Sequence, residues 1–188
     1  MTIPQDSNAD RSIKKLSING TFELTSNKII DSRGFFLNCF RVQDNSFNEI
    51  WGSRNIKQIN LSKNSKKGTI RGLHFQNEPY MECKLIKCLK GRVWDVAVDL
   101  RKKSSTYLNW LSIELSPELN NAILIPEGCA HGFQSLKDNS ELLYIHSNVW
   151  NPSFEDGIRW NDSQLNINWP LNPINISERD QSFPNLKK

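Results

Sequence analysis

The chain has 188 residues, of which 23% are charged and 37% hydrophobic, and this length suits one domain with its own core. The net charge of +4 is small, and interspersed acidic and basic residues argue against a nucleic-acid or membrane-surface partner, because both require a concentrated basic face. No apolar run is long enough to span a membrane, and the first residues lack the apolar centre of a secretory signal, so we expect a cytoplasmic protein.

Residues 1–15, MTIPQDSNADRSIKK, are polar, and we expect a loose, partly disordered arm before a single domain over residues 16–188. Within that domain, short runs rich in Val, Ile, Phe, Trp and Leu alternate with turn-forming residues. This regular spacing is typical of an all-β sandwich or barrel. The runs predict strands at Leu16–Leu24, Phe35–Arg41, Ile56–Leu61, Thr69–Phe75, Lys84–Leu89, Val93–Leu100, Trp110–Leu115, Ala122–Ile125 and Leu142–Trp150.

The run VWDVAVDL shows strand alternation most clearly. Successive side chains of a strand point to opposite faces, so Val93, Asp95, Ala97 and Asp99 share one face. Because two aspartates are out of place in a plain core, we expect this face to meet polar partners or a cavity.

Helix is scarce in the sequence. Ser46 and Glu49 have the spacing of a capping box, and the apolar residues that follow Ser46 fall on one helical face, which predicts a short helix ending near Gly52. Ser116–Glu118 predicts a capped turn at most, and Ile176–Asp180 predicts the start of another turn.

The four cysteines show neither a CxxC pair nor a Cys/His pair of the zinc type. We expect them to be scattered, reduced thiols, as in other cytosolic proteins of this size. They are Cys39, Cys83, Cys88 and Cys129.

The three histidines are candidate metal ligands. His131, in IPEGCAHGF, has the spacing of the second signature of cupin barrels, where this histidine often binds a metal. The first cupin signature needs two histidines one residue apart, and RGLHFQ supplies only His74. Since a metal needs three or four converging ligands, we expect none. His146 lies in an ordinary strand run, so we expect it to be a surface residue or a core residue whose hydrogen bonds are satisfied.

The segment RGLHFQ, residues 71–76, places a histidine where a strand otherwise resembles core. In a regular strand Arg71 and His74 point to opposite faces, but a bulge at Gly72 turns both toward one cavity. Lys84 begins the next strand, where antiparallel pairing brings it near. An interior with His, Arg and Lys is an anion site that contains a base. We expect the apolar neighbours of His74 to keep this interior dry, which strengthens the electrostatic interactions in it.

The chain resembles the dTDP-4-dehydrorhamnose 3,5-epimerase family of nucleotide-sugar enzymes over about residues 17–180. The resemblance rests on eight segments in the family's order: DSRGFF, QINLS, RGLHFQ, KLIKCLKGRVWDVAVDLR, IPEGCAHGF, LLYIHSNVWNP, GIRWND and NWP. It implies one fold, a cupin-type double-stranded β-helix (a jelly-roll barrel) with a few short helices. It also implies a cofactor-independent isomerase in dTDP-rhamnose biosynthesis.

The resemblance also implies a chemistry. The family's substrate is a 4-keto-6-deoxyhexose linked to a nucleoside diphosphate, and removing a proton from C3 or C5 gives an enolate. The reaction needs a base, a cation at the ketone oxygen and an acid on the opposite face. The family's base falls on His74, the carboxylate that orients it on Asp180, the cation on Lys84 and the proton donor on Tyr144.

The family's substrate contacts carry over to nine further positions: Arg33, Asn38, Gln58, Asn60, Arg71, His131, Trp150, Glu155 and Arg179. Two of them depart from the family's pattern. Asn38 replaces an acidic residue, which leaves the nucleoside preference open. Trp150 replaces a second tyrosine and has no proton to supply, which leaves single versus double epimerisation open.

Four alternatives stand beside an epimerase that inverts C3, C5 or both. They are a C3 mono-epimerase or a 3,4-ketoisomerase on a related sugar, a non-catalytic nucleotide-sugar-binding barrel, and a metal-dependent cupin dioxygenase. Family members are homodimers in which an N-terminal strand crosses to the neighbouring subunit, and the resemblance implies that Leu16–Phe22 forms that strand.

Overall fold

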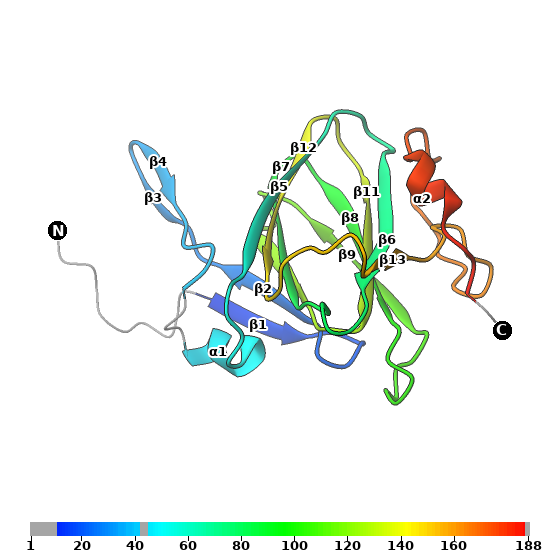
Figure 1. The fold of residues 1–188 in the computed structure, drawn as a ribbon. Helices are drawn as coiled ribbons and strands as arrows, with labels where there is room; N and C mark the ends of the chain where they lie inside the picture. Colours follow the sequence, from blue (N-terminus) through cyan, green and yellow to red (C-terminus); the bar gives the residue numbers. More distant parts are fainter. Residues whose placement is uncertain (1–10, 42–44, 187–188) are drawn as a thin grey trace.

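The structure, a computed structural model, describes residues 11–41 and 45–186, so most of the predicted N-terminal arm lies outside the described residues. Strands dominate this part of the chain (Figure 1). The elements are β1 (Arg11–Lys15), β2 (Phe22–Ser26), β3 (Ile29–Asp31), β4 (Gly34–Phe36), α1 (Asn45–Trp51), β5 (Gln58–Asn64), β6 (Ile70–Gln76), β7 (Lys84–Lys90), β8 (Val93–Asp99), β9 (Trp110–Leu115), β10 (Asn121–Ile125), β11 (Cys129–Ser135), β12 (Ser140–His146), β13 (Glu155–Gly157) and α2 (Glu178–Ser182).

Two antiparallel sheets face each other and form a barrel (Figure 1). The six-stranded sheet has the order β1-β2-β10-β7-β12-β5, and the five-stranded sheet has the order β13-β6-β11-β8-β9. Apart from β1-β2 and β8-β9, strands that pair in these sheets are not consecutive in sequence, as in a jelly roll. The predicted all-β jelly roll is confirmed, and the strands expected between residues 56 and 125 lie within three residues of their predicted ends.

The barrel interior changes from apolar to polar along β7 and β12. Ile86 on β7 and Leu142 on β12 belong to a core cluster that also contains residues of β8, β9, β10 and β11. Two residues away on the same inward faces stand Lys84 and Tyr144, and His146 follows Tyr144 at the same spacing. One end of the barrel is therefore filled by apolar side chains, and the other end is lined by polar and ionisable side chains.

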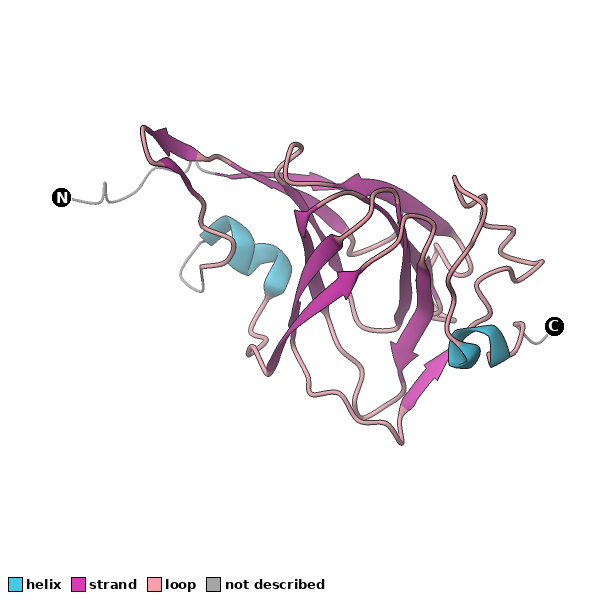
Figure 2. Ribbon diagram, turned by 90° about the horizontal axis from the view of Figure 1, so that it is seen from above, coloured by secondary structure: helices cyan, strands magenta, loops and turns pink. Residues whose placement is uncertain are grey.

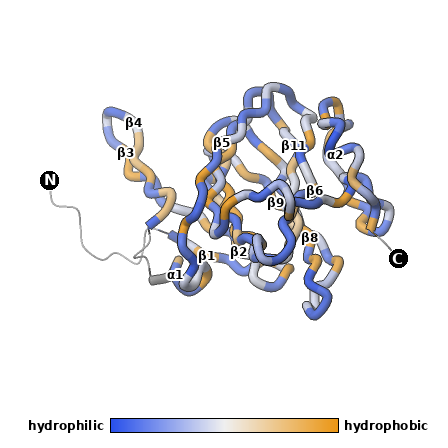
Figure 3. Tube along the Cα trace, viewed as in Figure 1, coloured by the Kyte–Doolittle hydropathy of each residue, from blue (hydrophilic) through white to orange (hydrophobic). Residues whose placement is uncertain are grey.

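The outer faces of both sheets are also covered (Figure 2). Helix α1 packs its Phe47 and Trp51 on the outside of the six-stranded sheet, in a cluster with Leu85. The segment that follows β13 covers the five-stranded sheet with Leu165 and Ile167. Each central strand is consequently buried on two sides, and hydrophobic positions recur along the barrel strands (Figure 3).

The prediction that both aspartates of β8 meet polar partners is confirmed. Asp95 lies 2.9 Å from the ring of His131. Asp99 accepts hydrogen bonds from Arg101, Ser104 and Thr106, which lie in the loop after β8.

Both predicted helical segments are present. Helix α1 ends at Trp51, before Gly52, whose positive φ of 67° stops the helix. Helix α2 begins after Ser177, whose hydroxyl accepts the N–H of Asp180. No helix of the described chain is long and apolar enough to cross a membrane.

The N-terminal part of the fold corrects three predictions. Arg11–Lys15, expected in the loose arm, forms β1, because Ile13 packs into the outer cluster while its neighbours face solvent. The strand expected at Leu16–Leu24 begins only at Phe22, since a turn connects β1 with β2. The strand expected at Phe35–Arg41 is reduced to the three residues of β4.

Besides β1, three strands were not predicted, namely β3, β11 and β13. Cys129–Ser135 forms β11, the centre of the five-stranded sheet, and each of its residues is buried. The expected strand Leu142–Trp150 is shifted toward the N-terminus, to Ser140–His146.

Candidate active site

A cavity of about 580 Å³ occupies the polar end of the barrel. Both sheets contribute to its walls, and all three histidines of the chain line it. Its lining residues are Ile59, Asn60, Leu61, Ser62, Lys63, Arg71, His74, Glu82, Lys84, His131, Phe133, Tyr144, His146, Trp150 and Glu155.

A bulge in β6 places Arg71 and His74 on the same wall. His74 pairs with His131 of β11, and Arg71 pairs with Phe133, so three steps on β6 match two steps on β11. Gly72 makes this possible, because its φ is 124° and an added Cβ would lie 2.5 Å from the Cα of a glycine in β11. The predicted bulge is confirmed.

His74 is held from behind by Asp180. Its Nε2 lies 2.9 Å from Asp180 Oδ1, and Oδ2 of the same carboxylate accepts the N–H of Gly72 at 3.0 Å. Burial alone would raise the pKa of Asp180, but the hydrogen bond and charge of His74 outweigh it and lower that pKa. Because an ionised carboxylate only accepts, Nε2 of His74 carries the proton and Nδ1 is left as the basic atom.

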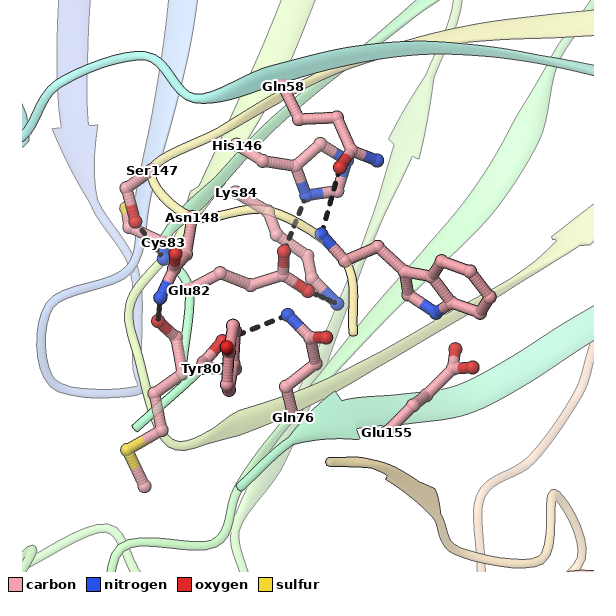
Figure 4. A network of polar contacts seen from close by, with 12 residues as sticks. Gln58, Gln76, Tyr80, Glu82, Cys83, Lys84, His146, Ser147, Asn148 and Glu155 are labelled. Atoms are coloured by element: carbon pink, nitrogen blue, oxygen red, sulfur yellow. Dashed lines mark hydrogen bonds and ion pairs between the residues drawn. The ribbon is translucent and has the colours of Figure 1, made fainter. Parts of the chain in front are cut away.

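Lys84 and His146 meet at Glu82 on the opposite wall (Figure 4). Glu82 Oε1 lies 3.1 Å from Lys84 Nζ, and Oε2 lies 2.9 Å from His146 Nδ1. Burial would raise the pKa of Glu82, but the hydrogen bond from His146 and the charge of Lys84 outweigh it and lower that pKa. His146 is buried and hydrogen-bonded, as the expected satisfied core residue would be, but it also lines the cavity, which the sequence prediction missed, as it missed Glu82.

Tyr144 stands between two of the histidines on the wall formed by β12. Its ring stacks on His146 with centroids 5.8 Å apart and meets the edge of His131 at 5.9 Å. Removal from water, aided by the negative charge of Asp95, raises the pKa of Tyr144 well above its usual value. The phenol therefore keeps its proton throughout the neutral range.

His131 forms the third histidine–carboxylate pair of the cavity. Its Nε2 lies 2.9 Å from Oδ2 of Asp95, which is fully buried. Burial raises the pKa of Asp95 more than the charge and hydrogen bond of His131 lower it. Oδ1 of Asp95 has no hydrogen-bond partner among the described residues.

The mouth of the cavity is tied together by amides. Gln58 accepts the backbone N–H of Trp150 at 2.8 Å and donates to Asn60 at 3.0 Å. Trp150 is 52% exposed. Arg179 donates two hydrogen bonds to Glu155, at 2.7 and 3.1 Å, and lies outside the lining.

Arg33 and Asn38 lie away from the cavity of their own chain. Arg33 is at the turn of the β3–β4 hairpin, which projects from the barrel (Figure 1), and its largely exposed side chain binds Asp31 at 2.6 Å. Asn38 follows that hairpin and accepts a hydrogen bond from Arg11 through its backbone carbonyl. A single chain therefore does not bring these two predicted residues to the site.

The remaining predicted residues converge. Arg71, His74, Lys84, His131 and Tyr144 line the cavity, and Asn60, Trp150 and Glu155 complete its wall. Among the residues that the structure describes, no group of three or more His, Cys, Asp or Glu side chains stands where it would hold a metal ion. The absence of a cofactor stays a prediction.

Residues 15–188 match the family described as dTDP-4-dehydrorhamnose 3,5-epimerase. The chain is 45% identical over 152 residues to the dTDP-4-dehydrorhamnose 3,5-epimerase of Shigella flexneri, which covers 80% of this chain and 82% of that protein. It is 36% identical over 169 residues to a dTDP-4-dehydrorhamnose 3-epimerase of Streptomyces niveus, covering 90% of this chain and 81% of that one.

A solved structure agrees with these relatives. The crystal structure of dTDP-4-dehydrorhamnose 3,5-epimerase from Bacillus anthracis, with TDP and PPi bound, superimposes with a TM-score of 0.89 at 32% identity. The match covers 94% of this chain and 99% of that chain. The barrel is therefore of the cupin type, as the sequence predicts.

Proposed function

The chain belongs to the dTDP-4-dehydrorhamnose 3,5-epimerase family, and we propose that it inverts C3 and C5 of a dTDP-linked 4-keto-6-deoxyhexose through an enolate. It is an isomerase, and its substrate is a nucleotide sugar. The observation that carries the mechanism is the cavity, in which a histidine–carboxylate base and a protonated tyrosine stand on opposite sheets with a lysine beside them.

Proton removal is assigned to His74. The hydrogen bond to Asp180 leaves Nδ1 free to accept a proton from the carbon next to the ketone. When it does so, the ring becomes an imidazolium beside a buried carboxylate, and their attraction stabilises the charge that forms.

Lys84 is assigned to the ketone oxygen. Negative charge develops on that oxygen as the proton leaves, and the ammonium of the buried Lys84, held in place beforehand by the fold, stabilises this charge. Arg71, on the wall opposite Lys84, offers a forked guanidinium that suits the diphosphate oxygens.

Tyr144 is assigned to proton return. Inversion requires that the new proton arrive on the face opposite the one from which the old proton left. His74 is on β6 of the five-stranded sheet, and Tyr144 is on β12 of the six-stranded sheet, so the two groups approach a bound sugar from opposite sides. The raised pKa of Tyr144 keeps it protonated until the enolate accepts its proton.

Dimerisation belongs to the same proposal. The β3–β4 hairpin carries four large apolar side chains, each between 61% and 75% exposed: Ile29, Ile30, Phe35 and Phe36. A lone hairpin is marginally stable, and an apolar cluster of this kind indicates a surface covered by another chain. A second copy would receive the hairpin and with it Arg33, which accounts for a predicted substrate contact that lies far from its own cavity.

In this proposal the segment that crosses to the partner is the hairpin and not Leu16–Phe22, because residues 16–21 form the connection between β1 and β2 and Phe22 begins β2. Mixing two variants that we expect to be inactive on their own, Arg33→Ala and His74→Asn, tests this. In a mixed dimer one cavity combines an intact His74 with an intact Arg33 from the partner, so part of the activity returns. Failure of the mixture to regain activity would contradict the exchange.

The function itself is tested with dTDP-4-keto-6-deoxyglucose in heavy water, following deuterium at C3 and C5 by NMR. We expect label at both carbons and none with His74→Asn. Label at C3 alone identifies a mono-epimerase, as in the Streptomyces niveus relative. A carbonyl that moves to C3 identifies a ketoisomerase, and binding without exchange identifies a non-catalytic barrel. The cytoplasmic location remains part of the proposal.

A further inference from the structure

Glu82, Lys84 and His146 form a connected group in the wall of the cavity (Figure 4). Both oxygens of Glu82 are engaged, one by Lys84 Nζ at 3.1 Å and the other by His146 Nδ1 at 2.9 Å. The sheet fixes this arrangement, because His146 at the end of β12 is in register with Lys84 at the start of β7. All three side chains are about nine-tenths buried.

The hydrogen-bonding chemistry fixes the tautomer of His146. An ionised carboxylate only accepts hydrogen bonds, so Nδ1 of the ring must donate to Glu82. In the neutral ring Nε2 is then an acceptor, and it lies 3.4 Å from the amide nitrogen of Asn60, which is a donor. Both ring nitrogens are consistent with the Nδ1–H form, whereas free histidine favours the Nε2–H form.

The contact with His146 limits how Glu82 can bind Lys84. A carboxylate with both oxygens free can turn them toward one ammonium group and compensate its charge more fully. Here one oxygen is kept by His146, so Lys84 meets a single oxygen, and its other N–H groups stay available to the cavity.

We infer that His146 is a positioning residue for Lys84, acting through Glu82: it holds the carboxylate so that the ammonium of Lys84 stays directed at the ketone oxygen of the substrate. The inference rests on the proposed function, because that function gives Lys84 its role at the enolate. His146 does not itself exchange a proton with the sugar in this arrangement.

Two variants of His146 separate this role from packing. His146→Asn keeps an amide N–H close to the place of Nδ1 and still donates to Glu82, whereas His146→Leu fills a similar volume without a donor. We expect His146→Leu to lower kcat for deuterium exchange at C3 about tenfold, the scale of one hydrogen bond to a charged group, with KM within about twofold. His146→Asn should retain kcat within about threefold of the wild type.

A spectroscopic measurement tests the same bond without substrate. The ¹⁵N spectrum of the wild-type protein should show His146 as the Nδ1–H tautomer, and Glu82→Gln should shift the ring toward Nε2–H. An Nε2–H ring in the wild type would overturn the inference, and so would an equal loss of kcat in the two His146 variants or a change confined to KM.

Different results would contradict the proposed function and the role of His146. If the wild type exchanges no deuterium with any dTDP-linked keto sugar, the proposed function falls and this inference falls with it. If the wild type exchanges deuterium but the Asn and Leu variants behave alike, only the role of His146 falls. Thermal unfolding of both variants shows whether either has lost its fold.

Discussion

Replacing Asp180 with asparagine tests whether the carboxylate behind His74 stabilises the ring when it takes up a proton. The two groups are in contact, with 2.9 Å between Nε2 and Oδ1, and Asp180 is almost fully buried. An amide of the same shape fills the same space without the charge. Because Asp180 does not line the cavity, we expect kcat to fall while dTDP binding is unchanged.

The size of the effect follows from the geometry. Opposite unit charges at the 2.9 Å contact distance attract each other by roughly 6 kcal/mol at an effective dielectric constant of about 20. The ring of His74 is partly open to water, and asparagine can still form a hydrogen bond with it. We therefore expect Asp180→Asn to raise the activation free energy of proton removal by about half of that attraction, roughly 3 kcal/mol. This corresponds to a loss of about 150-fold in kcat.

The assay is the rate of deuterium incorporation at C3 at saturating substrate, with dTDP binding measured by calorimetry. Asp156→Asn is the matched control, since Asp156 is an exposed carboxylate on β13 outside the lining. We expect the control to keep wild-type kcat. A loss of less than about fivefold for Asp180→Asn would refute the reasoning, because the ring would then become charged without help from the carboxylate.

The same pair of proteins shows a pH effect on stability. The folded-state pKa of Asp180 is lowered, because the hydrogen bond and charge of His74 outweigh burial. The resulting stabilisation is present above the unfolded pKa of about 3.9 and is lost as pH falls through the lower folded pKa. The difference in Tm between the wild type and Asp180→Asn should therefore shrink below about pH 4, relative to its value at pH 5.

Three further predictions concern the cavity and its frame. Lys84→Met should lower kcat about 100-fold. The control is Lys87→Met, equally buried on the other face of β7, which should lower Tm and keep kcat within about twofold. Equal losses of kcat in the two variants would contradict the role of Lys84. Trp150→Tyr should at least double the ratio of C5 to C3 deuterium by supplying a proton donor, and an unchanged ratio in the NMR assay would contradict this. Gly72→Ala should lower Tm by roughly 6–12 °C, the effect of about 3 kcal/mol, while Gly34→Ala, with a similar φ but open space around it, should lower it far less.

The strands could be predicted where burial differs between their faces or where turn residues bound them. β8 shows this, since its inward face carries Asp95 and Asp99 and its outward face is apolar. β11 has no such difference, because every residue of Cys129–Ser135 is buried in the centre of the sheet, and alternation gives no signal there. Arg11–Lys15 was missed because a single apolar side chain, Ile13, anchors it.

The site could be predicted only in part, because some of its contacts depend on register. Gly72 signalled the bulge that joins Arg71 and His74 on one wall. The pairing of His146 with Glu82 depends on the alignment of β12 with β7, which the sequence does not reveal. One signal was available, namely that His146 lies two residues after Tyr144 and so shares its face of the strand.

The apolar neighbours of His74 have a different cause from the one expected. Leu73 and Phe75 point away from the cavity and pack in the outer cluster, under the segment that contains Leu165. They therefore do not dry the base, whose side chain is 24% exposed. Instead they fix β6 against the segment that leads to Asp180, so the same packing that buries them sets the distance between the base and its carboxylate. In RGLHFQ, Leu73 and Phe75 thus pack on the outer face of the sheet, while Arg71 and His74 lie on the inner face that lines the cavity.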